Sequence, residues 1–170
     1  SDVCSSDLIL KPFRRNVDYL IDTSLLSPNQ LKESIVAQFL GKPENGMNIT
    51  CMSFGFKYGY PSEADLVFDV RCFKNPFYVE ELRNQTGNDQ AVVDYICSYP
   101  QAFEYLKLEA KRFDFLIPQY INEGKSQLVI SVGCTGGQHR SVFVANKIYE
   151  YLSTQGYKVE VSHRELSNRK

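Results

Sequence analysis

From about residue 46 onward, short apolar runs alternate with longer segments that have helical spacing. Four segments have the continuous or alternating apolar character of strands, namely 47–53, 65–71, 128–132 and 157–162. Helical spacing occurs in 89–98, in 100–123 and from Ser141 to a C-cap at Gly156. Pro118 is expected to kink or end the second of these helices. This order predicts an α/β domain with a layered sheet and helices on both faces.

The first 46 residues have a different character. SDVCSSDL (1–8) matches the translation of a sequencing adapter and is expected to be an artefact, so the natural protein should extend further upstream. Residues 9–41 contain one expected strand (18–23) and one helix after Ser27-Pro28, which is too little to form a core. KPENG (42–46) has the composition of a linker, and 47–170 forms the second domain.

A glycine-rich turn, Gly133–Arg140, separates the strand at 128–132 from the helix that begins at Ser141. A strand, a glycine loop and a helix in this order direct backbone N–H groups and the positive helix end at one point, which suits a phosphate. A second strand ends near Arg71, and ligands of parallel sheets bind beyond the carboxyl ends of strands. We therefore expect a phosphate site made of Thr135, Gly136, Gly137, His139, Arg140, Ser141 and Arg71.

Three interpretations of this loop compete. The spacing Cys134-x5-Arg140-Ser141 fits cysteine-dependent phosphatases, in which a thiolate attacks phosphorus and a nearby Asp, here Asp69 or Asp89, acts as general acid. In the second interpretation the loop only binds a phosphorylated ligand and Cys134 is a packing residue. In the third, the glycines and the arginine serve a tight turn alone. Nucleotide loops are excluded, because neither GK[ST] nor GxGxxG is present.

Charge distribution bears on possible partners. The formal net charge is −1, which gives no whole-molecule attraction to nucleic acid. Residues 124–170, however, carry seven Lys or Arg against three Glu, a local charge of +4. If RNA is bound, the expected phosphate contacts are Lys57, Arg164, Arg169 and Lys170, joined by Arg71 and Arg140.

The cysteine and hydropathy patterns exclude two further kinds of protein, metal-binding and membrane-spanning proteins. The five cysteines show no CxxC spacing and there are two histidines, so no metal site is expected. Cys51, Cys72 and Cys97 lie in apolar stretches and are interpreted as small buried hydrophobes. No apolar run reaches membrane-spanning length, so no membrane partner and a cytoplasmic location are expected.

Several motifs in order resemble the RapZ family of bacterial RNase adapters and nucleotide-binding proteins. The residues that carry the resemblance are SFGFKYG (53–59), ADLVFDVR (64–71), NPFYVEELRNQTG (75–87) and GCTGGQHRSV (133–142). DYLIDTS (18–24) resembles the end of that family's N-terminal P-loop kinase-like domain. The resemblance covers essentially everything after Leu8.

The resemblance implies a two-domain parent whose N-terminal half binds ATP or GTP, with weak NTPase activity there. Residues 9–41 would be the strand–helix end of that half, and 47–170 the domain that senses a phosphosugar, with glucosamine-6-phosphate as ligand. Neither enzymatic activity nor a cofactor is implied for the fragment itself. Implied partners are a small RNA and an endoribonuclease, and the intact parent would be a homo-oligomer with a regulatory adapter role.

This sequence departs from the better-known adapters at two loop positions and in its tail. Gln138 stands where they carry Lys and Tyr58 where they carry His, and the C-terminal tail is less basic. Each difference removes positive charge, which is the main source of RNA affinity.

Overall fold

The structure, a computed structural model, describes residues 28, 31, 35 and 47–167. The chain divides into two compact units, residues 1–44 and 45–170. Pro28, Leu31 and Ile35 are helical, within the helix expected after Ser27. The adapter-like segment, the expected strand at 18–23, the linker, Arg169 and Lys170 lie outside the described residues.

The second unit is built on a four-stranded sheet in which every pairing is parallel. Its strands are β1 (Asn48–Gly55), β2 (Leu66–Asp69), β3 (Gln127–Cys134) and β4 (Lys158–His163), arranged in the order β2-β3-β1-β4. Gly55 pairs with Cys134 and Asp69 with Gly133, so the carboxyl ends of the strands meet at one edge of the sheet. The predicted α/β class is confirmed.

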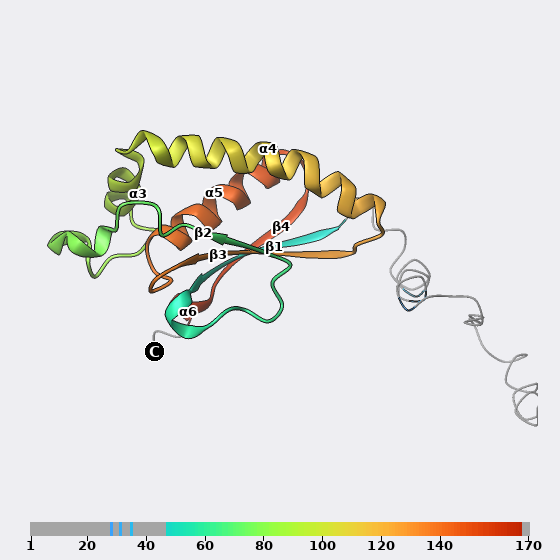
Figure 1. Cartoon of the computed structure of the whole chain (residues 1–170), viewed down its shortest axis with the longest axis horizontal. Coiled ribbons are helices and arrows are strands. Elements are labelled where there is room, and N and C mark those ends of the chain that lie inside the picture. Colours follow the sequence, from blue (N-terminus) through green and yellow to red (C-terminus); the bar gives the residue numbers. More distant parts are fainter. Residues whose placement is uncertain (1–27, 29–30, 32–34, 36–46, 168–170) are drawn as a thin grey trace, which may run out of the picture. The chain divides into compact units, whose positions relative to one another are not determined.

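Helices connect the strands and pack against the sheet. They are α3 (Gln90–Cys97), α4 (Pro100–Asn122), α5 (Arg140–Thr154) and α6 (Arg164–Ser167), with 3-10 turns η2 (Phe56–Tyr58), η3 (Pro76–Tyr78) and η4 (Glu80–Leu82). Figure 1 shows α3, α4 and α5 together on one side of the sheet and α6 on the other. Pro118 does not end the second helix, because α4 continues to Asn122.

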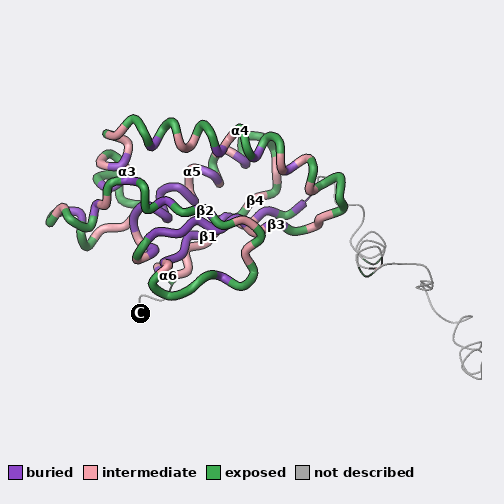
Figure 2. Tube along the Cα trace, viewed as in Figure 1, coloured by how far each residue is buried: buried purple, intermediate pink, exposed green. Residues whose placement is uncertain are grey.

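The core lies between the sheet and α5, where Figure 2 shows the longest buried stretches. Burial alternates at the start of β1, where Ile49 and Cys51 are buried, whereas β3 is buried at every position from Ile130 to Cys134, as expected for a central strand covered on both faces. Phe113 of α4 packs edge-to-face on Phe68 with ring centroids 5.5 Å apart. Of the three cysteines expected to be buried, Cys51 is buried and Cys97 is only partly buried. The expectation is wrong for Cys72, which is exposed because it follows the end of β2 and lies outside the covered sheet.

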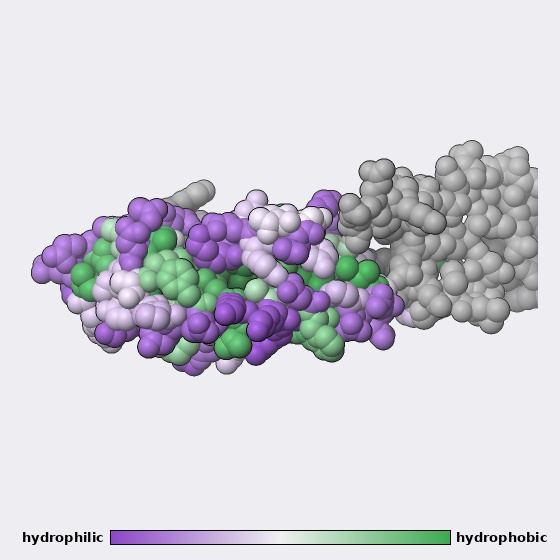
Figure 3. All heavy atoms as spheres, turned by 90° about the horizontal axis from the view of Figure 1, so that it is seen from above, coloured by the Kyte–Doolittle hydropathy of each residue, from purple (hydrophilic) through white to green (hydrophobic). Residues whose placement is uncertain are grey.

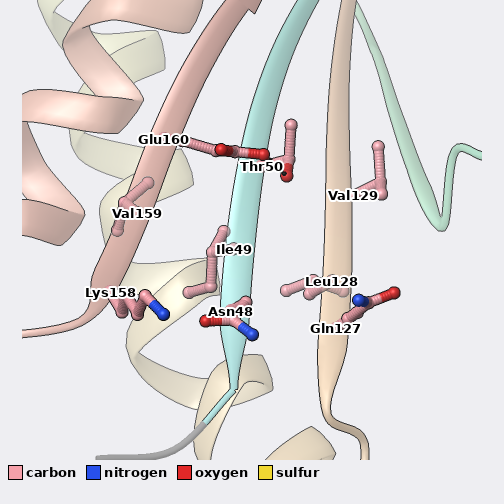
Figure 4. A pocket seen from close by; sticks show the side chains of 9 residues that line it. All are labelled: Asn48, Ile49, Thr50, Gln127, Leu128, Val129, Lys158, Val159 and Glu160. Carbon is pink, nitrogen blue, oxygen red and sulfur yellow. Dashed lines mark hydrogen bonds between the residues drawn. The ribbon is translucent and has the colours of Figure 1, made fainter.

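Two surfaces lie away from the core, one at the amino-terminal ends of the strands and one on the helix side. At the amino-terminal ends of β1, β3 and β4, a cavity of about 470 Å³ opens on the sheet, and in it Thr50 donates to Glu160 over 2.8 Å (Figure 4). Seen from the helix side, hydrophilic and hydrophobic residues are interspersed over the surface (Figure 3). Among residues 28, 31, 35 and 47–167, no helix combines the length and apolarity needed to cross a membrane.

Candidate functional site

The glycine loop lies at the carboxyl edge of the sheet, between the end of β3 at Cys134 and the start of α5 at Arg140. His139 is the N-cap residue of α5, and its side chain makes no capping hydrogen bond. The first-turn N–H groups of a helix carry partial positive charge and have no partner within the helix. The fold therefore directs the positive end of a 15-residue helix at the loop.

Two glycines let the loop approach the end of β1 closely. Gly137 has φ +72°, and a Cβ there would lie 2.6 Å from Gly55 N and 2.6 Å from Glu165 Oε2. A Cβ on Gly55 would lie 2.8 Å from the carbonyl carbon of Gly136. A Cβ on Gly136 itself would meet nothing within 4 Å. Gly137 is thus required by packing and backbone conformation, whereas Gly136 faces open space.

Cys134 supports the loop from inside. It is 3% exposed, and its Sγ accepts a hydrogen bond from Gly137 N–H at 3.2 Å. The same sulfur is 3.1 Å from the hydroxyl of Ser141, which is completely buried. These contacts link both ends of the turn.

Arg140 and His139 attach the loop to the segment that follows β2. Arg140 Nη1 donates to the carbonyls of Arg71 (3.1 Å) and Phe73 (2.9 Å), and its Nε is buried with no hydrogen-bond partner. His139 Nε2 is 3.1 Å from the carbonyl of Leu82, which can only accept, so this nitrogen donates. Both side chains therefore stabilise the architecture as well as lining the site.

A cavity of about 360 Å³ opens in front of the loop. No Asp or Glu is among its lining residues, which are Lys57, Tyr58, Asn75, Phe77, Tyr78, Cys134, Thr135, Gly136, Gln138, His139 and Arg140. Three aromatic side chains form an exposed rim: Tyr58 (56% exposed), Phe77 (48%) and Tyr78 (81%). Two cationic side chains, one helix N-terminus and no carboxylate make the cavity electrostatically suited to an anion.

Arg71, expected to contact the phosphate, has another partner. Its guanidinium binds Asp69 through two nitrogens, with Nη2 at 2.6 Å from Oδ2, and lies 4.3 Å from the centroid of the Phe56 ring. Arg71 does not line the cavity, and of the expected site residues Gly137 and Ser141 also lie behind its surface. Thr135, Gly136, His139 and Arg140 do come together there.

The two candidate general acids are both held as carboxylates. Hydrogen bonds from Arg71 lower the pKa of Asp69 below its ordinary value. Asp89 accepts hydrogen bonds from the backbone N–H (2.6 Å) and the hydroxyl (2.8 Å) of Thr86, which lower its pKa as well. A general acid needs a raised pKa, so neither residue is prepared for proton donation.

Arg164, expected to contact RNA, instead connects three segments of the chain. Its Nη2 donates to the carbonyls of Gly55 (3.2 Å) and Gly59 (2.9 Å), and its Nε donates to Glu165 at 2.8 Å. Glu165 is buried, and its second oxygen has no hydrogen-bond partner. Of the other expected RNA contacts, Lys57 lines the cavity.

Sequence reasoning did not assign the aromatic rim to the site. The NPFY run at 75–78 is part of a motif that resembles the RapZ family, and it lies in a long irregular loop of the kind that is usually functional, but its aromatic residues are not among the expected site residues. Within the part of the chain that the structure describes, no cluster of three or more His, Cys, Asp or Glu could hold a metal ion.

Fold and site together define a parallel α/β domain with a glycine loop at the N-terminus of a helix, facing a cavity without acidic residues. The chain belongs to the RapZ family: residues 47–167 match the RapZ C-terminal domain. This confirms the resemblance seen in the motifs.

Curated relatives agree with this assignment. The chain is 52% identical over 158 residues to nucleotide-binding protein TTE1834 of Caldanaerobacter subterraneus subsp. tengcongensis, covering 92% of this chain and 56% of the relative. It is 49% identical over 159 residues to a nucleotide-binding protein of Acetivibrio thermocellus, covering 93% and 55%. The chain thus spans about half the length of these relatives.

Proposed function

We propose that this domain binds the phosphate group of a phosphorylated sugar at the glycine loop and acts as a regulatory binding domain without hydrolysing its ligand. The observation that carries the proposal is the lining of the loop cavity, which combines Lys57, Arg140 and the start of α5 with no carboxylate. A phosphate dianion gains from all three, whereas a cationic or neutral ligand does not. Glucosamine-6-phosphate is the ligand that family membership suggests.

Calorimetric titration tests this proposal directly. Glucosamine-6-phosphate should bind, and unphosphorylated glucosamine should bind much more weakly, because only the former carries the anion. Equal affinity for the two sugars would place the phosphate elsewhere.

The most informative variant is Lys57→Met rather than Arg140→Ala. Arg140 also holds two backbone carbonyls, so its removal should reduce both affinity and stability. Lys57 is exposed, and its loss should weaken glucosamine-6-phosphate about two- to fivefold, from roughly 0.4–1 kcal/mol of lost attraction. Lys107→Met, an exposed lysine of α4 outside the cavity, is the matched control and should bind like wild type.

A cysteine-dependent phosphatase is the second candidate, and one observation favours it. Cys134 lines the cavity, and its sulfur accepts a hydrogen bond from the backbone of the loop that leads into α5, an arrangement that phosphatases use to stabilise a thiolate. Against it, both Asp69 and Asp89 are engaged by strong donors. An aryl phosphate assay decides: we expect no turnover, and turnover that disappears in Cys134→Ser would favour the phosphatase.

The wider adapter role is proposed for the parent protein. Relatives carry the name nucleotide-binding protein, and a domain upstream of this region would bind ATP or GTP, with weak NTPase activity. Small RNA, an endoribonuclease and further copies of the parent are the proposed partners. RNA binding would rest on Lys57, Arg169 and Lys170, since Arg164 is engaged, and should weaken steeply with added salt.

A further inference from the structure

A second cavity, of about 400 Å³, lies between the segment that leaves β2 and the junction of α3 with α4. It is distinct from the loop cavity, with which it shares no lining residue. Its volume falls in the range of small-molecule sites, roughly 300–1,000 Å³, and is far larger than the space of one water.

The lining of the second cavity has an apolar and a polar part. Phe73, Ile96 and Ala102 are 8%, 2% and 2% exposed, so the residues that form its apolar part belong to the core. Phe73 is fixed by edge-to-face packing on Tyr105, with ring centroids 5.2 Å apart. This part of the cavity is therefore rigid and unsuited to holding an isolated ion.

One cation stands at its rim. Lys74 is the sole charged residue of the lining, and its Nζ lies 4.2 Å from the centroid of the Tyr99 ring. Its hydrogen bond to Tyr99 lowers the pKa of that phenol, and Tyr95 packs edge-to-face on Tyr99 with ring centroids 5.6 Å apart. Within residues 47–167, no carboxylate pairs with Lys74. The exposed ammonium thus lies against the Tyr99 ring and has no carboxylate partner among these residues.

We propose that the second cavity binds a small carboxylic acid with an apolar body, Lys74 holding the carboxylate and the body lying against Tyr99 and Phe73, above the buried Ile96 and Ala102. A monoanion matches the single ammonium, whereas a phosphate dianion is usually held by several donors. The apolar part favours a hydrocarbon portion, which chloride lacks and which in acetate is a single methyl group. This site is separate from the glycine loop and does not depend on the function proposed there.

Occupancy of the second cavity can be measured through Cys72, because this residue lines the cavity and is exposed. Alkylation of Cys72 by iodoacetamide, followed by peptide mass spectrometry, measures access to the cavity in the full chain. Cys97, partly buried and outside the lining, serves as the internal reference. The probe is 3-phenylpropionate, and the uncharged analogue is 3-phenylpropanol.

A ligand of this size is expected to bind with a Kd on the order of 1 mM, so about 10 mM should slow Cys72 alkylation roughly tenfold. Lys74→Met should abolish this protection, and Lys107→Met, which changes an exposed lysine of α4 outside the cavity, should retain it. The proposal is overturned if there is no protection, if phenylpropanol protects equally, or if protection persists in Lys74→Met. Equal protection by acetate or inorganic phosphate would also overturn it, by showing an adventitious ion only. Failure of glucosamine-6-phosphate to bind the loop would not change any of these outcomes.

Discussion

Replacing Gly137 by Ala tests whether the glycine loop is held in one conformation by its contact with β1. Gly137 has φ +72°, where a side chain costs on the order of 1–3 kcal/mol. The new Cβ would also lie 2.6 Å from the backbone nitrogen of Gly55, a contact that backbone must move to relieve, at about 1–3 kcal/mol. Lower entropy of the unfolded chain returns about 0.4–1 kcal/mol. We expect Gly137→Ala to lower the free energy of unfolding by about 2–5 kcal/mol.

Two other glycines separate the contributions to this value in urea titrations followed by far-UV circular dichroism. Gly156 has φ +83° but open space around its Cβ position, so Gly156→Ala measures backbone strain alone. Gly136→Ala should change stability by less than about 1 kcal/mol. Because Gly136 lines the cavity, that variant should still weaken glucosamine-6-phosphate. The reasoning fails if Gly137→Ala is no less stable than Gly156→Ala.

Three further predictions concern the rest of the domain. Burial raises the pKa of Glu109 above its ordinary 4.5, so the contribution of Glu109 to stability is most favourable below pH 4.5 and is lost as the pH rises through the folded-state pKa. Glu109→Gln should therefore have a higher melting temperature than wild type at neutral pH, and this difference should vanish in acid. A lower melting temperature of the variant at neutral pH would contradict this prediction. Arg164→Ala leaves the buried Glu165 without its partner and should lower the free energy of unfolding, measured in urea titrations, by about 3 kcal/mol. An unchanged urea midpoint would show that the Arg164–Glu165 ion pair does not contribute to stability. Burial raises the pKa of Cys51 to about 12, so native protein treated with iodoacetamide should be modified at Cys72 and not at Cys51, and rapid loss of the Cys51 thiol would show that the sheet opens.

Local pattern was sufficient for the elements that form the site. The strand at 128–132 corresponds to β3, and the helix expected from Ser141 begins one residue earlier, at Arg140. The apolar run of the strand and the helical spacing that follows it are both patterns within a few residues. The glycines between them indicate a turn independently of the rest of the chain. The same applies to β1, β2 and β4, whose apolar alternation reports burial on one sheet face.

Side-chain partners were the part that local pattern could not supply. Arg71 and Arg164 were both expected to contact phosphates, yet one binds Asp69 and the other binds carbonyls more than 100 residues away in the chain. A guanidinium satisfies a backbone carbonyl as well as a phosphate, so its sequence position does not reveal which it meets. Cys72 was expected to be buried from its apolar neighbours, but β2 ends at Asp69, before it.

The sequence by itself determined the α/β class, the order of the elements, the position of the glycine loop and the family, because these depend on periodicity, turn residues and local motifs. The tertiary structure decided which loop residues face the cavity and which support it from behind. Gly136 and Gly137 are adjacent and chemically identical, yet one faces open space and the other packs against β1. It also brought the aromatic rim of 58–78 to the loop at 134–140, through parallel strands whose carboxyl ends share one edge. That juxtaposition results from long-range strand pairing, which no local stretch of the sequence encodes.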